Sequence, residues 1–204
     1  MSLAVSTSRI VQTAFRFLEM RLPSSLDDES EEAIAAQEQY DRALGLCLEA
    51  GDWSFASELL ILPQIIAGAV PVDPRLPYAS RLPPDALALR EVVTQRTASG
   101  ASSINWRIDR DVLRADAAGP LLVRCTKRVT DEAALPATFQ TAVALQLAIL
   151  LAGTYLQVAS KRAALEGQLQ EAMTRAARTD ARSASSASWS QSGATDDWSA
   201  GAVR

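Results

Sequence analysis

The longest apolar stretch of the chain runs from Thr138 to Leu156, shortly after Leu135 and Pro136. Its apolar residues cover nearly every side of a helical wheel, which is typical of a helix buried on several faces. The polar residues Gln140, Thr141 and Gln146 interrupt the stretch, and Gln157 follows its end. No apolar run therefore reaches the roughly 20 residues that a bilayer span requires, and we expect a buried helix without membrane insertion.

The sequence changes character from Ser160 to Arg182, where it becomes rich in charge and alanine. A narrow apolar stripe at helical spacing remains, formed by Leu165, Leu169, Met173 and Ala176. The two patterns predict helices at about 136–156 and 159–182, separated between Gly153 and Ser160. The stripe is shorter than the three to four heptads that a coiled coil needs, by the usual rough rule.

Two further helices are predicted near the N-terminus. Residues 7–22 carry apolar side chains at helical spacing, and Pro23 ends that pattern. Residues 29–50 repeat the spacing, with Asp28 as the expected N-cap and acidic residues in the first turn that oppose the helix dipole.

The end of this second predicted helix is marked by glycine and aromatic residues. Gly51 stands where a left-handed residue commonly ends a helix. Trp53 and Phe55 follow at once, and we expect them to fold back and seal the helix end against the core.

The middle of the chain has no helical pattern. Prolines break the stretch from Leu59 to Pro84, which predicts an extended, proline-stiffened segment. Apolar and polar residues then alternate in three stretches, at 86–93, 104–108 and 121–129. Tight turns at 109–111 and 119–120 and a loop at 94–103 complete a small antiparallel meander.

Together these patterns predict an α+β fold. We expect mainly an α-helical bundle with a small antiparallel β-sheet insertion at about 86–130 and a flexible C-terminal tail. Residues 1–182 would form the domain and residues 183–204 the tail. With 204 residues, of which 48% are hydrophobic, the chain is long enough to bury a core of this size.

The composition excludes several functional classes. A net charge of -4 and a pI of about 5.0 argue against a surface that grips phosphate backbones. The sequence has no histidine, so the commonest general base and metal ligand is missing. Cys47 and Cys125 lack metal-ligand spacing and predict buried, reduced thiols. Residues 1–8 lack the pattern of a signal peptide, and we expect synthesis in the cytoplasm.

The charged clusters predict surfaces rather than catalytic centres. The sequence shows no phosphate-binding loop, acidic metal motif or nucleophile elbow. We interpret the densest acidic group as a solvated helix start rather than a cation site; it consists of Asp27, Asp28, Glu29, Glu31 and Glu32. We interpret the carboxylates around the predicted hairpin as turn formers; these are Asp109, Asp111 and Asp116. We therefore expect no enzymatic activity, no cofactor and no metal.

Basic residues gather in two places. Arg124, Lys127 and Arg128 lie on the last predicted strand. The terminal helix carries Lys161, Arg162, Arg175, Arg178 and Arg182. We interpret both groups as solvated faces or subunit contacts rather than as contacts that read a nucleic-acid sequence.

The tail, residues 183–204, is dominated by serine, alanine, glycine, threonine and aspartate, which predicts disorder in an isolated subunit. Trp189 and Trp198 do not suit a purely solvating segment, because an indole can bury a large area in a partner's pocket. An unstructured terminus without a role fits the composition equally well.

The order of these features resembles the head-to-tail adaptor family, also called tail tubular protein A, of tailed bacteriophages and gene transfer agents. The resemblance spans roughly Ser30 to Arg182. The residues that carry it are Gly51-Asp52-Trp53-Ser54-Phe55-Ala56, Leu82-Pro83-Pro84-Asp85-Ala86-Leu87-Ala88-Leu89-Arg90, Gly119-Pro120-Leu121-Leu122-Val123-Arg124, Arg128-Val129-Thr130-Asp131, Leu135-Pro136 and Ser160-Lys161-Arg162.

The resemblance implies a structural connector without catalytic activity. Such a subunit forms a homo-oligomeric ring, a dodecamer, beneath the portal protein, and a downstream tail or stopper protein binds on the other side. DNA passes through the channel without sequence-specific binding, and the protein resides in the virion at the head-tail interface. The resemblance also implies that the C-terminal segment docks on the portal, which would involve Trp189, Trp198 and Arg204.

A second hypothesis is a cytosolic helical interaction module or regulator. Its C-terminal helix would then form a coiled coil with a partner along the stripe that begins at Leu165. The mass of the purified protein, alone and mixed with portal, separates the two hypotheses.

Overall fold

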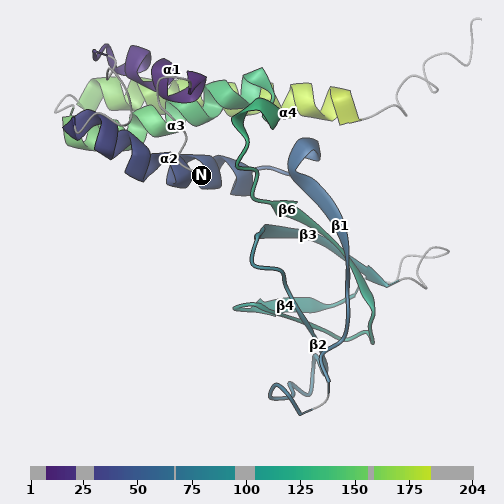
Figure 1. Cartoon of the computed structure of the whole chain (residues 1–204). Coiled ribbons are helices and arrows are strands. Elements are labelled where there is room, and N and C mark those ends of the chain that lie inside the picture. The colour runs from purple at the N-terminus through teal and green to yellow at the C-terminus, as the bar shows by residue number, and fades with distance from the viewer. Residues whose placement is uncertain (1–7, 22–29, 67, 95–103, 156–158, 185–204) are drawn as a thin grey trace, which may run out of the picture.

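The computed structural model describes residues 8–21, 30–66, 68–94, 104–155 and 159–184. Within them the chain divides into a helical body and a β part that projects from one side of it (Figure 1). About 50% of the chain is helical and 24% is strand. The predicted α+β class is confirmed, but the expectation of mainly a helical bundle is wrong, because the strands extend well beyond the predicted insertion.

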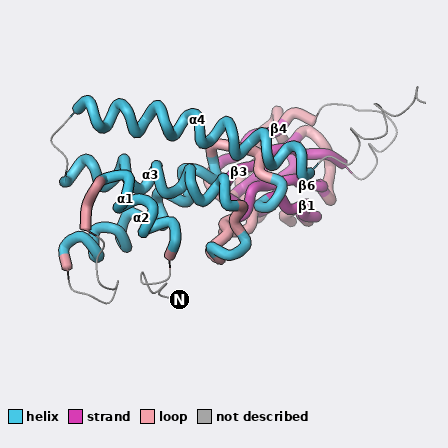
Figure 2. The backbone as a smooth tube through the Cα atoms, turned by 90° about the horizontal axis from the view of Figure 1, so that it is seen from above, coloured by secondary structure: helices cyan, strands magenta, loops and turns pink. Residues whose placement is uncertain are grey.

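The central helix of the body is covered by helices of the same chain. The described helices are α1 (Arg9–Leu18), α2 (Glu31–Glu49), α3 (Ala137–Tyr155) and α4 (Ala159–Ala184). The other three all pack against α3, and α4 runs alongside it in the view from above (Figure 2). Four consecutive residues of α3, Ala142, Val143, Ala144 and Leu145, are buried although they point in different directions around the helix, so the predicted burial on several faces is confirmed.

The apolar stripe of α4 also faces the core. Leu165 and Ala176 are buried, and Leu169 and Met173 pack partly buried against the same apolar cluster. The helices α3 and α4 are separated as predicted, and residues 156–158 between them lie outside the described structure. Among the helices described, none combines the length and the apolar character needed to cross a bilayer.

Side-chain caps fix where the first two helices begin. The Ser30 hydroxyl accepts a hydrogen bond from the Ala33 N–H at 3.3 Å and caps α2. The expected cap at Asp28 is therefore wrong, because α2 begins at Glu31 and the serine directly before it caps the first turn. In α1 the cap is Ser8, and Glu132, far away in sequence, accepts from the Ile10 N–H at 3.1 Å.

The β part consists of two three-stranded antiparallel sheets. Sheet A has the order β1-β6-β3 and sheet B the order β2-β5-β4. The strands are β1 (Ser57–Leu62), β2 (Tyr78–Arg81), β3 (Ala86–Thr94), β4 (Trp106–Asp109), β5 (Val112–Ala115) and β6 (Leu121–Lys127). Short 3-10 helices, η1 (Ser54–Ala56) and η3 (Glu132–Ala134), join sheet A to α2 and α3.

This topology corrects two expectations. The proline-rich stretch holds β1 and β2, so strands begin already at Ser57 rather than at about residue 86. The strands do not form a meander either, because β1 and β3 both pair with β6 and β2 pairs with β5. Their partners lie far along the chain, beyond the reach of local periodicity. Of the predicted loop, residues 95–103 lie outside the described structure.

The two sheets enclose an apolar cluster separate from that of the helical body. Leu62, Leu121 and Val123 of sheet A face Leu113 and Ala115 of sheet B. The register shows that alternate residues of β1 therefore point away from this cluster, at Ser57, Leu59 and Ile61.

Candidate functional site

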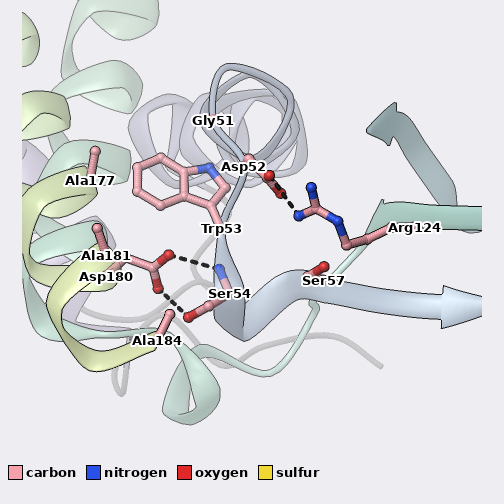
Figure 3. A pocket seen from close by; sticks show the side chains of 10 residues that line it. All are labelled: Gly51, Asp52, Trp53, Ser54, Ser57, Arg124, Ala177, Asp180, Ala181 and Ala184. Atoms are coloured by element: carbon pink, nitrogen blue, oxygen red, sulfur yellow. Dashed lines mark hydrogen bonds and ion pairs between the residues drawn. The ribbon is translucent and has the colours of Figure 1, made fainter. Parts of the chain in front are cut away.

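The three predicted portal-docking residues, Trp189, Trp198 and Arg204, lie outside the described structure. The chain leads to them from Ala184, the last residue of α4. A groove adjoins that residue where the helical body meets sheet A (Figure 3). We call it the joint groove; its walls are Asp180, Ala181 and Ala184 of α4 on one side and Asp52, Ser57 and Arg124 on the other.

Trp53 forms the floor of the joint, where the chain turns from α2 towards β1. Its side chain is 2% exposed, and its indole N–H donates to the Cys47 carbonyl oxygen at 2.9 Å. Its ring meets the ring of Phe139 edge to face at 4.9 Å, and Phe55 meets Phe139 at the same distance. Trp53 and Phe55 thus seal the helix end as predicted.

Gly51 is required by this packing rather than by its backbone conformation. A Cβ atom at Gly51 would lie 2.6 Å from Cε2 of the Trp53 ring, closer than atoms can approach. Ala50, the C-cap of α2, is right-handed, and Gly51 does not have a positive φ, so the predicted left-handed helix end is wrong. The aromatic ring, not the turn, selects glycine here.

Asp180 attaches the end of α4 to the joint. Its carboxylate accepts from the Ser54 N–H at 2.7 Å and from the Ser54 hydroxyl at 2.6 Å (Figure 3). These residues are 126 positions apart, so no local pattern in the sequence indicates the contact. Ser54 is the first residue of η1. The contact therefore attaches the last turns of α4 to the segment that joins α2 to β1.

Arg124 forms the opposite wall of the groove. Its Nη1 lies 2.7 Å from Oδ2 of Asp52, and its Nε lies 3.3 Å from Oε2 of Glu91. The hydrogen bond that it donates to Asp52 is the main reason that the pKa of the Arg124 guanidinium is raised above its usual value. Arg124 therefore joins the loop after α2 to sheet A.

Arg90 makes the second connection between α2 and sheet A. Its Nη2 donates to the carbonyl oxygen of Glu49 at 3.0 Å and to that of Gly51 at 2.5 Å. Its Nε donates to the Thr126 hydroxyl at 2.9 Å. A cation at a helix C-terminus satisfies carbonyls that have no helical partner and interacts favourably with the helix dipole.

The basic residues of the last strand act within the chain. Lys127 Nζ lies 2.6 Å from Glu58 and 2.8 Å from Asp85, and the hydrogen bond that it donates to Asp85 is the main cause of its raised pKa. Arg128 is exposed. On α4, Arg175, Arg178 and Arg182 are exposed as well, in line with the predicted solvated face.

The hairpin carboxylates hold sheet B together. Asp109 pairs with Arg107 and Arg114, both at 2.8 Å, and these guanidinium groups lower its pKa. Asp116 accepts from the Asn105 side chain at 2.7 Å. Asp111 lies 3.4 Å from Arg81 across the strands. These contacts fit the predicted role in turns and add pairing between strands.

Both cysteines are buried and unpaired, as predicted. Burial raises the pKa of the Cys47 thiol to about 12 and also raises the pKa of the Cys125 thiol. Of the acidic group at the start of α2, only Glu31 and Glu32 are described, and both lie in its first turn. Over the described ranges, no group of three or more histidine, cysteine, aspartate or glutamate side chains could hold a metal ion.

No protein-family model matches the sequence, and a comparison with curated proteins gives no match.

Proposed function

We propose that the chain is a structural head-to-tail connector subunit, which forms a ring beneath the portal of a tailed phage or gene transfer agent. One observation carries the proposal. Segments that bear the resemblance, although far apart in the sequence, meet at the joint: Arg90 donates to Gly51, and Arg124 pairs with Asp52. Residues that define a family resemblance through their order are thus also connected in space.

The architecture suits such a subunit. The helical body and the β part lie at different ends of the described structure (Figure 1), so one could line a ring while the other reaches towards the tail. A closed ring uses heterologous contacts, in which two different surfaces of each copy meet. An acidic protein lets DNA slide through such a ring without holding it.

The surface that would contact ring neighbours is not α3, since helices of the same chain cover it. Apolar side chains that remain exposed on the helical body are better candidates. Ile34 and Leu46 of α2 are 47% and 42% exposed. We place the contacts between copies on α2 and its surroundings.

The partners follow from the same proposal. The ring comprises twelve copies, binds the portal protein on one side and a downstream tail or stopper protein on the other, and resides in the virion. Trp189, Trp198 and Arg204 act as portal anchors at the end of a segment that leaves the body at Ala184. The chain acts through its geometry, without a catalytic step or a cofactor.

The alternative, a regulator that pairs through its C-terminal helix, loses its main support. The stripe that would form the seam packs against α3, with Leu165 and Ala176 almost fully buried. A partner helix would have to displace α3 from it.

Removal of the gene from the encoding phage or gene transfer agent tests the proposal. We expect DNA-filled heads that carry portals but no tails, seen by electron microscopy, and recovery of tailed particles when the chain is supplied from a plasmid. Normal tailed particles without the chain would refute the connector function.

A further inference from the structure

The outer face of sheet A, turned away from sheet B, carries exposed apolar side chains. Leu59 and Ile61 of β1 are 62% and 59% exposed. In the register, Ile61 lies beside Leu122 of β6, and Leu122 lies beside Val93 of β3. Paired residues in antiparallel strands share a face, so these side chains form one patch. Large exposed apolar patches mark interaction surfaces.

This outer face is continuous with the joint groove. Ser57 lines the groove and lies on the same face of β1 as Leu59 and Ile61. Arg124 also lines the groove and lies opposite Leu59 in the register. Ala184 stands on the other wall (Figure 3). The segment of residues 185–204 therefore begins at one end of the apolar face.

The length of that segment suffices to reach the patch. Trp189 follows Ala184 by five residues, which span up to about 17 Å when extended. From Ser57 to Ile61, β1 advances four residues, or about 14 Å. The extended span to Trp189 therefore exceeds the length of β1 from Ser57 to Ile61, and Leu59 lies at only half of that length.

The composition of the segment also suits the surface. Trp189 stands between Ser188 and Ser190, so a large planar side chain is flanked by small ones. An indole buries a large area on an apolar surface with few rotamers to fix. Residues 95–103, which follow β3 at the far end of the patch, offer no apolar side chain larger than alanine.

We propose that the outer face of sheet A is an intrachain docking surface for residues 185–204, with the Trp189 indole on Leu59 and Ile61. This contact goes beyond the connector function, because the isolated chain makes it before any partner binds. A portal that takes up the same tryptophan must displace it from the sheet. The surface therefore keeps the segment docked until the chain reaches its partner.

Acrylamide quenching of tryptophan fluorescence in the full-length chain tests the contact. In a chain with Trp106→Phe and Trp198→Phe, the remaining fluorescent tryptophans are Trp189 and the buried Trp53. We expect Trp189 to be quenched several-fold less than in a peptide of residues 185–204. In the chain that also carries Leu59→Asp and Ile61→Asp, acrylamide should quench Trp189 as strongly as in the peptide. Ile66→Asp is the matched control, because Ile66 is 83% exposed and lies off this face, and it should change nothing.

A reciprocal measurement does not depend on substitutions in the sheet. In the otherwise unchanged chain, Trp189→Ser should increase deuterium uptake in β1, whereas Trp198→Ser should do so much less. Two results would overturn the proposal. Acrylamide could quench Trp189 in the full chain as strongly as in the peptide, or the substitutions at Leu59 and Ile61 could leave the quenching of Trp189 unchanged. Shielding that rises with protein concentration would assign the segment to a second copy and would also overturn the intrachain contact.

Discussion

Nη2 of Arg90 on β3 lies 3.0 Å from the carbonyl oxygen of Glu49 in the last turn of α2. The same guanidinium reaches Gly51 and Thr126, so one side chain joins the helical body to sheet A. Arg90→Met keeps the aliphatic stem but leaves these acceptors without a charged donor. We expect a loss of about 2–3 kcal/mol in the free energy of unfolding, measured by urea denaturation.

Arg81→Met is the matched control for this change. Arg81 is also a strand arginine, but its side chain is 71% exposed and pairs with Asp111, whose side chain is 61% exposed. Arg81→Met should lower the free energy of unfolding by less than about 0.5 kcal/mol. Equal effects of the two substitutions would show that Arg90 is not a structural connection.

Gly51→Ala tests the aromatic packing at the joint. The new Cβ would lie 2.6 Å from the Trp53 ring, which is itself fixed by Cys47 and Phe139. We expect a loss of about 1–3 kcal/mol from this overpacking, with altered near-ultraviolet circular dichroism. Gly167→Ala in α4 meets nothing within 4 Å and should instead stabilise the chain by about 0.5–1 kcal/mol. A harmless Gly51→Ala would contradict the packing argument.

Asp180→Ala should loosen the end of α4. The Ser54 N–H and hydroxyl lose their acceptor, at a cost of about 1 kcal/mol because the contact is exposed. Hydrogen exchange should accelerate in the last two turns of α4 and in η1, while β6 stays unchanged. Glu171→Ala removes an exposed carboxylate on the same helix and serves as the control. Unchanged exchange in Asp180→Ala would rule out the attachment.

Stability should fall as the pH rises from 9 to 10. Burial raises the pKa of Cys47 from an ordinary value of 9.0 to about 12, so in this window the unfolded thiol loses its proton and the folded thiol keeps it. The contribution of Cys47 to the free energy of unfolding is complete below the pKa of the thiol in the unfolded chain. It is lost progressively above that pKa, by at most about 1.4 kcal/mol per pH unit. Cys47→Ala should flatten the pH dependence of the urea midpoint. A slope equal to that of the unchanged chain would refute this.

Removal of residues 185–204 should leave the fold intact and weaken attachment to the portal. Far-ultraviolet circular dichroism should match that of the full chain, and the thermal transition should fall only slightly, because the segment docks on the outer face of sheet A and lies outside the two apolar clusters. Trp189→Ser with Trp198→Ser in the full chain should reproduce the loss of attachment. Equal portal binding by truncated and full chains would sink the docking role of the tail.

The helices were predictable because their signals are local. The apolar spacing of α1 and α4 and the all-round apolar character of α3 each lie within one stretch of sequence. Strands β1 and β2 were missed because β6 and β5, their partners, lie far along the chain. The surrounding prolines also pointed to an extended segment rather than to a sheet.

The joint shows the same limit. The sequence indicated that Trp53 closes a helix end, but it assigned Gly51 to a turn, since a ring packed on a glycine leaves no local pattern. The contact between Ser54 and Asp180 joins residues 126 positions apart. Arg124 stood out only as part of a basic cluster, and its pairing with Asp52 depends on the three-dimensional fold.

The mass of the complex between this chain and the portal tests the connector function most directly. The purified chain, alone and mixed with portal rings, can be weighed by native mass spectrometry or mass photometry. We predict a ring of twelve copies on each portal, formed even when the free chain is monomeric. A stable dimer that ignores the portal would contradict the proposed function.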